Sequence, residues 1–322
     1  MLEKISDLVL ACPELQEWPE LRSILNKAKP GTISFFDIAY STMGNTEIDS
    51  NPIRGAILCF LVQCILIDDI LDEDEKGAWK DLGAGRTANL ASALQARQHF
   101  LVYESKFSDQ QKQETSFCLG QMNLKIAHVQ ELATQNKVNE DLYWKIVHGK
   151  SGNICGSSMK MGAILGEASS QELEILYSIG KHMGEIGQIS NDLRGAFQKQ
   201  VNPDWNMPGS SLPILLALTA EHEYLDELKE LMSQDLSQEG RLERAQDLLI
   251  KSGAVSRCCD HISQRLLLVH QKLDESRVPK KEHLYENIGE DLKHAIQWLR
   301  NLGIDLSQKT KQAMRDIEDQ LK

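Results

Sequence analysis

Proline, aromatic residues and positive charge are all scarce in this chain, and each shortage argues against a class of protein. The 322 residues include 8 prolines and 6% aromatic residues, so few helix breakers interrupt the chain and a helical protein is favoured. Lysine and arginine together number 35 against 47 acidic residues, which gives a formal net charge of −12. Nucleic acids and anionic membrane surfaces attract basic patches, so neither is expected as the main partner.

The sequence also lacks metal-type cysteine pairs and long apolar runs. None of the 7 cysteines belongs to a C-x-x-C pair, and their apolar surroundings predict reduced thiols. The longest apolar run, Ile57–Ile67, is far too short to cross a bilayer and contains Gln63. The first residues mix acids with apolar positions, unlike a signal peptide. We therefore expect a soluble, cytoplasmic protein without an integral membrane segment.

The distribution of apolar residues predicts helices almost throughout. Apolar residues recur every three or four positions, with charged residues between them, as in residues 218–232, 241–255 and 291–304. No alternating pattern typical of strands is present, and no repeat is apparent. The pattern predicts an all-α fold. Because the composition does not change along the chain, residues 1–322 are expected to form a single domain.

One predicted helix, residues 53–71, is apolar on nearly every face, which indicates a central helix surrounded by others. Its apolar part ends at Ile67, and Asp68, Asp69 and Asp72 follow. At spacings of three and four residues these carboxylates share one side of a turn. There they repel one another and the negative end of the helix dipole. They either mark the point where the helix leaves the core for solvent, or are gathered around a cation.

A second polar patch lies in residues 184–197, where Gln188, Asn191 and Asp192 have helical spacing. Oxygen ligands on two facing helices suit Mg²⁺, which retains water and shares the oxygens of a phosphate. Between the two patches, Lys150 precedes a run of small residues that indicates close packing or the wall of a cavity. Lys150 is either a surface lysine or a cation that binds a diphosphate.

At these positions the sequence resembles the trans-isoprenyl diphosphate synthases (polyprenyl synthetases) and the class I terpene synthases, which share one fold. "DDILD" (68–72) resembles their first aspartate-rich motif, DDxxD, and "GQISNDLRG" (187–195) stands where the second, usually FQxxDDxxD, belongs. "GKSG" (149–152) matches the position of the family's Lys-Thr pair. "GQMNLKIA" (120–127) resembles the GQxxDL segment, and "DWNMPGSSLPILLAL" (204–218) resembles D-L-x-x-G-K-x-T-L-P.

The resemblance implies an isoprenoid synthase type helical bundle around a central active-site cavity. It also implies an enzyme that ionises an allylic prenyl diphosphate with about three Mg²⁺ ions, and a homodimer. The roles it implies are catalysis for Asp68, Asp69, Asp72 and Asp192; metal binding for Asp68, Asp72, Gln188, Asn191 and Asp192; diphosphate binding for Arg54, Lys150 and Arg194; and a place in the substrate cavity for Phe60, Cys64 and Gln121.

The departures from the family pattern concern the second substrate. Chain-elongating members hold isopentenyl diphosphate with a G-G-K-R-x-R-P segment, whereas "DSNPIRG" (49–55) retains only Arg54. The paired arginines after the first motif are replaced by "EDEKGAW" (73–79), and the lysine of G-K-x-T-L-P is lost as well. Each charge-assisted contact to phosphate is worth about 1.5–3 kcal/mol. Affinity for isopentenyl diphosphate should therefore fall by orders of magnitude.

Asn191 and Gly195 replace the outer aspartates of the second motif, and an asparagine there also resembles the terpene synthases' N-D-x-x-S-x-x-x-E. The first expectation is therefore a terpene synthase acting on a fifteen- or twenty-carbon allylic diphosphate. The alternative is a prenyltransferase that elongates an isoprenyl diphosphate or prenylates a non-isoprenoid acceptor. A non-catalytic synthase subunit is the third reading. The intact "DDILD" argues against it, because a scaffold has no need of crowded carboxylates.

Overall fold

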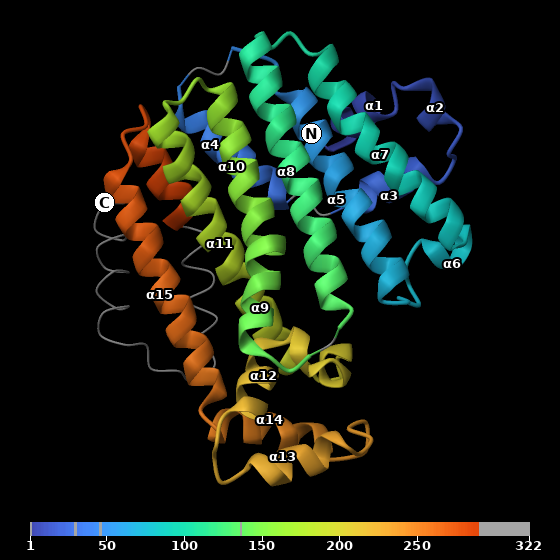
Figure 1. Ribbon diagram of the computed structural model, residues 1–322, viewed down its shortest axis with the longest axis vertical. Coiled ribbons are helices and arrows are strands. Elements are labelled where there is room, and N and C mark those ends of the chain that lie inside the picture. The colour runs from blue at the N-terminus through green and yellow to red at the C-terminus, as the bar shows by residue number, and fades with distance from the viewer. Residues whose placement is uncertain (1, 29–30, 45–46, 136, 290–322) are drawn as a thin grey trace. The chain divides into compact units, whose positions relative to one another are not determined.

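The computed structural model describes residues 2–28, 31–44, 47–135 and 137–289, and all regular structure within these ranges is helical (Figure 1). The predicted all-α fold is confirmed. In the ranges that the structure describes, no helix combines the length and the hydropathy of a membrane span. The cytoplasmic location stays a prediction, and the helix predicted at 291–304 lies outside the described residues.

The α-helices are α1 (Leu2–Val9), α2 (Pro13–Gln16), α3 (Leu21–Lys27), α4 (Gly31–Thr42), α5 (Asn51–Leu71), α6 (Trp79–Leu82), α7 (Ala84–Glu104), α8 (Asp109–Ala133), α9 (Glu140–Val147), α10 (Asn153–Leu165), α11 (Ser170–Ala196), α12 (Leu212–Thr219), α13 (Leu225–Met232), α14 (Arg241–Lys251) and α15 (Ala254–Glu275). A π-helical turn, η1 (His148–Gly152), follows α9. Two short 3-10 helices, η2 (Pro203–Asn206) and η3 (Pro208–Ser210), precede α12.

The chain divides into two compact units, each assembled from separate segments. Among the described residues, unit 1 comprises 2–130, 154–180 and 276–284, and unit 2 comprises 131–153, 181–275 and 285–289. The single domain expected for residues 1–322 stays a prediction.

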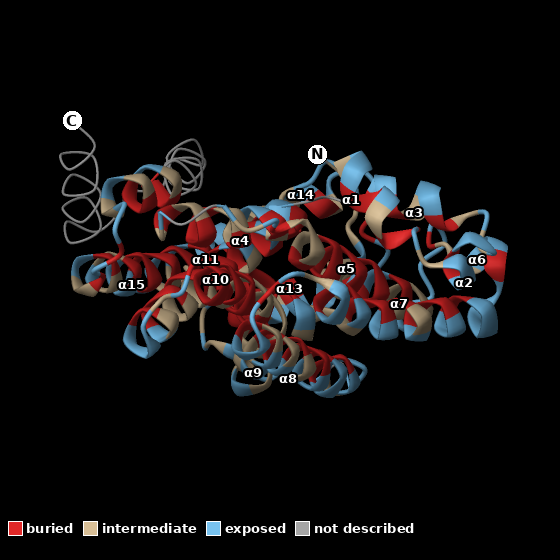
Figure 2. Cartoon of the chain, turned by 90° about the horizontal axis from the view of Figure 1, so that it is seen from above, coloured by how far each residue is buried: buried red, intermediate tan, exposed pale blue. Residues whose placement is uncertain are grey.

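Unit 1 contains α5, the helix that the sequence predicted to be central. It begins at Asn51 with Pro52 in its first turn, where the missing N–H of proline costs no hydrogen bond. It packs along α7 and also contacts α1 and α4. Its side chains from Ile53 to Phe60 are almost all buried (Figure 2). Each fully buried aliphatic or aromatic side chain contributes about 1.5–3 kcal/mol, so the apolar sequence accounts for the helix's position in the core.

A closed ring of three side-chain amides ties α5 to α7 and α8 inside unit 1. Gln98 Nε2 donates to Gln63 Oε1 at 2.8 Å, Gln63 Nε2 donates to Asn123 Oδ1 at 2.6 Å, and Asn123 Nδ2 donates to Gln98 Oε1 at 3.0 Å. Asn123 Nδ2 also donates to the Leu119 carbonyl oxygen at 2.9 Å. The three side chains are at most 8% exposed, so each would be costly to bury without these partners.

The run of small residues in α10 serves close helix packing, one of the two roles predicted for it. A Cβ atom added at Gly162 would lie 2.4 Å from the Phe36 carbonyl oxygen of α4. A Cβ at Gly156 would lie 2.8 Å from the Tyr177 carbonyl oxygen of α11. Glycine is therefore required where the backbones of α4 and α11 approach α10.

In unit 2, helices α12, α13, α14 and α15 pack against one another, and their boundaries refine two predicted helices. Residues 218–232 form the end of α12 and then α13, because His222 folds back to the Ala217 carbonyl oxygen at 2.8 Å. The helix predicted at 241–255 is interrupted before α15 by Gly253, whose φ of 77° belongs to the left-handed region.

The packing of α10 on α4 leads to a testable prediction. Gly162→Ala should lower the free energy of unfolding by about 1–3 kcal/mol, because the new methyl group meets backbone atoms that cannot rotate away. Urea denaturation followed by circular dichroism would measure it. Gly85→Ala in α7 is the matched control, since no atom lies within 4 Å of its added Cβ. Equal stabilities of the two variants would contradict the packing described here.

Candidate active site

The first acidic motif lies at the end of α5, and its carboxylates differ in exposure. Asp68 and Asp69 are half-buried in the last turn, whereas Asp72 caps the helix and is exposed. Gln130 of α8 donates from Nε2 to Asp68 Oδ1 at 2.9 Å. A simple exit of the helix into solvent does not describe Asp68 and Asp69, because both are held against protein groups.

The segment after the motif folds back onto Asp69. The backbone N–H of Ala78 donates to Asp69 Oδ2 at 3.2 Å, and a Cβ at Gly77 would lie 2.7 Å from Asp69 Cβ. The turn begins at Glu73, whose φ is 52°. The residues that replace the family's paired arginines therefore form a tight loop that holds Asp69.

The electrostatics of Asp69 fit a site for a cation. Burial raises the pKa of Asp69, the hydrogen bond from Ala78 opposes that rise, and the nearby charges of Asp74, Asp68 and Asp72 raise the pKa further. Like charges gathered around a partly desolvated carboxylate disfavour ionisation. A bound cation would reverse this effect.

The second acidic patch, on α11 in unit 2, is centred on a buried carboxylate. Asp192 is 3% exposed. Its Oδ2 accepts hydrogen bonds from the Tyr143 hydroxyl at 2.6 Å and from the Leu212 N–H at 3.0 Å, and its Oδ1 accepts one from Gln188 Nε2 at 2.8 Å. Burial raises the pKa of Asp192 to about 6, although these hydrogen bonds lower it. Both oxygens of Asp192 are therefore already engaged by the protein.

The other members of the patch are arranged differently. Asn191 and Arg194 are exposed on α11. A Cβ at Gly195 would lie 2.8 Å from Asp204 Oδ2, so the carboxylate of Asp204 occupies the space beside the position of the missing outer aspartate. Burial raises the pKa of Asp204. Asp204 was not predicted from the sequence as a residue of this patch. The one sequence feature that points to it is Gly195, whose missing side chain leaves space for a neighbouring group.

Lys150 lies in η1, the π-helical turn between α9 and α10. The next residue, Ser151, donates from its hydroxyl to Gln188 Oε1 at 2.7 Å. The turn that carries Lys150 is therefore bonded to the same glutamine that bonds Asp192. Turns of this type occur often at functional sites, and the apolar periodicity of the sequence gave no sign of one here.

Arg54, the cation retained in the reduced isopentenyl diphosphate segment, is paired within unit 1. Its Nε lies 2.7 Å from Asp37 Oδ1, and its Nη1 donates to Asn51 Oδ1 at 3.1 Å. Burial raises the pKa of Asp37, while the hydrogen bond and charge of Arg54 lower it. The sequence predicted that Arg54 binds diphosphate, but the carboxylate of Asp37 already offsets much of its positive charge. The role of Arg54 stays a prediction.

The three residues predicted to line the substrate cavity have different surroundings. Phe60 and Cys64 are buried in α5 at 0% and 6% exposure. Gln121 is exposed on α8, on the side that carries Phe117 and Leu124. It is Asn123, two residues after Gln121, that reaches α5. The exposure of Gln121 does not fit a position beside Phe60, and its role in a cavity stays a prediction.

The donor sets of both patches consist of oxygen atoms, which suits Mg²⁺. Within the described ranges no three His, Cys, Asp or Glu side chains are arranged to hold a metal ion. Mg²⁺ commonly takes only one or two carboxylates from the protein and completes its shell with water and phosphate oxygens. The residues present therefore fit an ion that binds together with a diphosphate.

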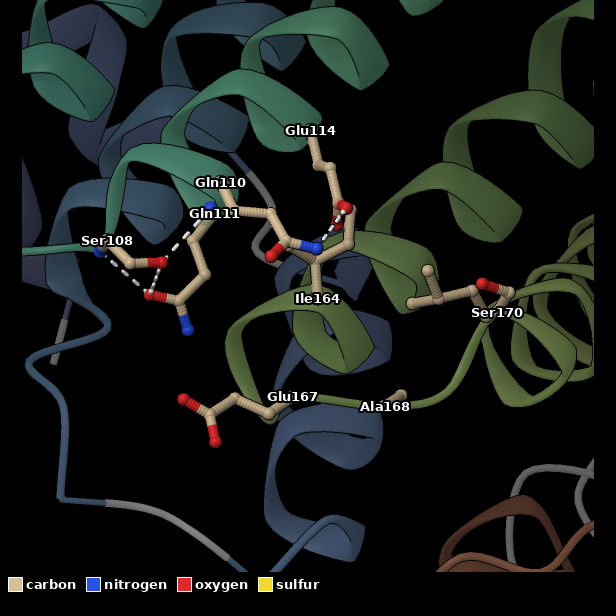
Figure 3. A pocket seen from close by; sticks show the side chains of 9 residues that line it. Ser108, Gln110, Gln111, Glu114, Ile164, Glu167, Ala168 and Ser170 are labelled. Carbon is tan, nitrogen blue, oxygen red and sulfur yellow. Dashed lines mark hydrogen bonds between the residues drawn. The ribbon is translucent and has the colours of Figure 1, made fainter.

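A pocket of about 300 Å³ in unit 1 has the wrong chemistry for this role (Figure 3). It lies where α8 and α11 begin and α10 ends. Glu114 and Glu167 contribute to its lining, and none of its lining residues is Lys, Arg or His. A diphosphate would meet negative charge there without any compensating cation. None of the site residues predicted from the sequence lines it.

Glu185 is a charged residue near the second patch to which the sequence gave no role. It is 1% exposed on α11. Its Oε1 lies 2.6 Å from His148 Nδ1, and its Oε2 lies 2.8 Å from Arg265 Nε and 3.2 Å from His182 Nδ1. Burial raises the pKa of Glu185, but the hydrogen bonds of His148 and His182 and the charge of Arg265 outweigh burial and hold it well below its usual range.

Comparison with known proteins gives a consistent assignment. A family model described as polyprenyl synthetase matches residues 33–249. A prenyl transferase of Porphyra purpurea is 27% identical over 153 residues, which span 45% of this chain and only 44% of that protein. A geranylgeranyl diphosphate synthase of Mycobacterium tuberculosis is 24% identical over 249 residues, 70% of this chain and 68% of that protein.

Two solved structures share the fold over nearly the whole chain. A geranylgeranyl pyrophosphate synthetase from Pyrococcus horikoshii has a TM-score of 0.78 at 17% identity, with 90% of this chain and 93% of that chain covered. A geranylgeranyl pyrophosphate synthase from Corynebacterium glutamicum, complexed with isoprenyl diphosphate and magnesium, has a TM-score of 0.73 at 15% identity, with 90% and 99% covered. The predicted isoprenoid synthase fold is confirmed.

The comparisons change which of the predicted functions is favoured. The relatives named above are prenyl transferases and prenyl diphosphate synthases. They support an enzyme of prenyl transfer, which the sequence placed second, over the terpene synthase that it placed first. The terpene synthase was predicted from Asn191 and from the missing cations of the isopentenyl diphosphate segment. Neither feature outweighs the match of the family model.

The surroundings of Glu185 predict how stability depends on pH. Because its folded pKa lies below the usual value of 4.5, the ionised carboxylate contributes stability that is fully present above pH 4.5 and is lost as the pH falls towards the folded pKa. Glu185→Gln should therefore lower the melting temperature at pH 7, and its difference from the unsubstituted protein should shrink below pH 4.5. Thermal unfolding from pH 7 to pH 3 would measure this. A constant difference would contradict the low pKa.

Proposed function

Because the chain belongs to the polyprenyl synthetase family, we propose that it transfers the prenyl group of an allylic diphosphate, with isopentenyl diphosphate as the acceptor and a longer prenyl diphosphate as the product. The observation that carries this proposal is the acidic end of α5, where Asp68, Asp69 and Asp72 lie within two turns. Burial, together with the charges of Asp74, Asp68 and Asp72, raises the pKa of Asp69 there. Carboxylates in this arrangement are suited to a divalent ion that bridges to a diphosphate.

The residues of the chain would act by binding and orienting the leaving group. Asp68 and Asp72 would hold Mg²⁺ ions at the end of α5, and Lys150 and Arg194 would offset the remaining charge of the diphosphate. Bound Mg²⁺ stabilises the negative charge that develops as the carbon–oxygen bond breaks. Apolar walls that exclude water would then protect the allylic cation until the acceptor attacks it.

In the second motif we assign metal binding to Asn191 and a positioning role to Asp192. Asp192 already accepts three hydrogen bonds from Tyr143, Leu212 and Gln188, and a cation would have to displace one of them. Asn191 is exposed and offers an uncharged oxygen. Asp204, beside Gly195, supplies negative charge close to Asp192. We infer a weaker ion site here than at the first motif, because a neutral ligand replaces a carboxylate.

A second candidate function is prenyl transfer to a non-isoprenoid acceptor. It is favoured by the ion pair between Arg54 and Asp37, which leaves less positive charge for a second diphosphate. Removing charge-assisted contacts to a diphosphate weakens its binding more than that of a neutral acceptor. The two candidates use the same metal site and the same allylic substrate, and they differ in whether isopentenyl diphosphate is consumed.

One assay tests the function and the first motif together. The purified protein with Mg²⁺ and geranyl, farnesyl or geranylgeranyl diphosphate should form longer diphosphates only when isopentenyl diphosphate is added. Asp68→Asn should lower this rate at least about a hundredfold, because a ligand to the charge-stabilising ion is removed. Product analysis by mass spectrometry measures both effects.

The control for this assay is Glu75→Gln, which alters an exposed acid of the next turn that pairs with Lys80 at 2.7 Å. Surface pairs of this kind contribute little, so this variant should keep full activity. Hydrocarbon formed from one substrate would overturn prenyl transfer in favour of cyclisation. Consumption of the allylic diphosphate only with an added indole or peptide acceptor would favour the second candidate.

We propose further that the protein acts as a homodimer formed through one face of α7 and α8. Phe100 and Tyr103 of α7 are 56% and 75% exposed, and Phe117 and Leu124 of α8 are 69% and 70% exposed. They lie on the sides of these helices away from the buried amide ring. Large apolar side chains gathered on neighbouring helices are typical of an interface, and a second copy offers the same apolar face in return.

Charge introduced on this face should separate the subunits. Phe117→Asp combined with Leu124→Asp should convert a dimer of the 36.3 kDa chain into a monomer, because ionised carboxylates would have to be buried at the interface. Sedimentation velocity measures the change. Ile250→Asp on α14 is the control, since Ile250 is 58% exposed on a helix outside the proposed face. An unsubstituted protein that sediments as a monomer would overturn the dimer.

A further inference from the structure

Three elements of unit 2, namely η1, α11 and α15, meet at the carboxylate of Glu185. Oε1 contacts His148 at the start of the π-helical turn, and Oε2 contacts Arg265 of α15 and His182 of α11, at 2.6, 2.8 and 3.2 Å. Lys181 Nζ lies 3.8 Å from Oε1. A buried carboxylate with this many donors is fixed in position, because each bond is charge-assisted and water cannot replace it.

Arg265 is fixed as firmly as the carboxylate it binds. Its guanidinium carbon lies 4.0 Å from the centre of the Trp144 ring, a distance suited to a cation–π contact. Its Nη1 donates to the His261 carbonyl oxygen at 3.1 Å. The Trp144 ring in turn stacks on the ring of His148, with centres 5.9 Å apart. Trp144 of α9 contacts Arg265, Arg265 binds Glu185, Glu185 binds His148, and His148 stacks on Trp144. The four side chains therefore form a closed ring of contacts.

This ring of contacts holds the first residue of the π-helical turn in place, and a separate hydrogen bond holds the other end of the turn. His148 opens the turn and is held by Glu185, while Ser151 is held by Gln188 at 2.7 Å. Gly152 closes the turn, and a Cβ there would lie 3.3 Å from Glu185 Cγ. Lys150 lies between His148 and Ser151. A π-helical turn is less stable than an α-helical one and persists where its surroundings determine it.

We propose that Glu185 and Arg265 are positioning residues that hold the π-helical turn in register with α11, so that Lys150 presents its ammonium group to a diphosphate. Neither residue is assigned a contact with the substrate. The proposal rests on the proposed function in taking Lys150 as a diphosphate ligand. Without the ion pair between Glu185 and Arg265, the turn can relax towards regular α-helix. Lys150 would then rotate about the helix axis and away from the diphosphate.

The test uses inorganic diphosphate with Mg²⁺ as the probe, measured by titration calorimetry on the full chain. Glu185→Gln keeps the shape of the side chain and removes its charge, and it should weaken diphosphate binding about tenfold. Arg265→Lys keeps the charge but loses the fork and the stacking on Trp144, and it should weaken binding in the same direction. In steady-state assays both should raise KM for the allylic diphosphate more than they lower kcat.

A second readout separates positioning from general stability. Hydrogen exchange of residues 148–152 should accelerate in Glu185→Gln, whereas exchange in α13 should stay unchanged. The control is Glu172→Gln, which alters another buried carboxylate of α11, one that accepts hydrogen bonds from Ser276 Oγ at 2.9 Å and from the Arg277 N–H at 2.6 Å. It should lower stability without changing diphosphate affinity.

The outcomes distinguish this inference from the proposed function. Glu185→Gln and Arg265→Lys that bind diphosphate as tightly as the unsubstituted protein would overturn the positioning role, even if prenyl transfer is observed. An unsubstituted protein that binds diphosphate but transfers no prenyl group would overturn the proposed function alone. Equal weakening by Glu172→Gln would also overturn the positioning role, because the effect would then follow from lost stability.

Discussion

Asp68, Asp69 and Asp72 carry like charges at the end of α5, a helix whose other side chains are largely buried. The burial that stabilises α5 fixes where the carboxylates lie. Burial of Asp69 and the nearby charges of Asp74, Asp68 and Asp72 raise the pKa of Asp69. The surrounding chain accommodates this charge locally. Gln130 bonds Asp68 and the loop at Gly77 closes over Asp69. The side-chain amide of Gln130 and the backbone N–H of Ala78 thus hold Asp68 and Asp69 in place.

The second motif accommodates its negative charge differently from the first, by burying it. Its retained aspartate, Asp192, is almost fully buried, and its charge is met by a phenol, an amide side chain and a backbone N–H. Deeper burial raises the pKa of Asp192 to about 6. One motif therefore presents partly exposed carboxylates. The other uses its carboxylate to connect α11 with the first residue of α12 and with Tyr143 of α9.

The sequence predicted those features that depend on local spacing. The predicted helix at 53–71 corresponds to α5, because apolar residues on nearly every face specify a helix that is largely buried. The acidic patches were found for the same reason, since i, i+3 and i+4 spacing places side chains on one face. For the small residues of α10 the sequence left close packing and a cavity wall as alternatives, and Gly156 and Gly162 serve close packing.

The features that escaped prediction depend on partners distant in the sequence. Periodicity cannot reveal that Arg54 pairs with Asp37 or that Asp204 lies beside Gly195, because each partner lies on another segment. The π-helical turn at 148–152 depends on contacts to Glu185 and Gln188, so its local sequence reads as ordinary helix. Such contacts decide which of the predicted site residues are exposed and which are already engaged.

The amide ring of Gln63, Gln98 and Asn123 has a consequence that its individual bonds do not suggest. Each amide donates to one neighbour and accepts from the other, so the bonds circulate in one sense, and reversing one amide requires reversing all three. The Leu119 carbonyl oxygen removes the symmetry, because it accepts only from the nitrogen of Asn123. The circulation therefore has a single direction, and one backbone oxygen of α8 sets the orientation of polar side chains on three helices.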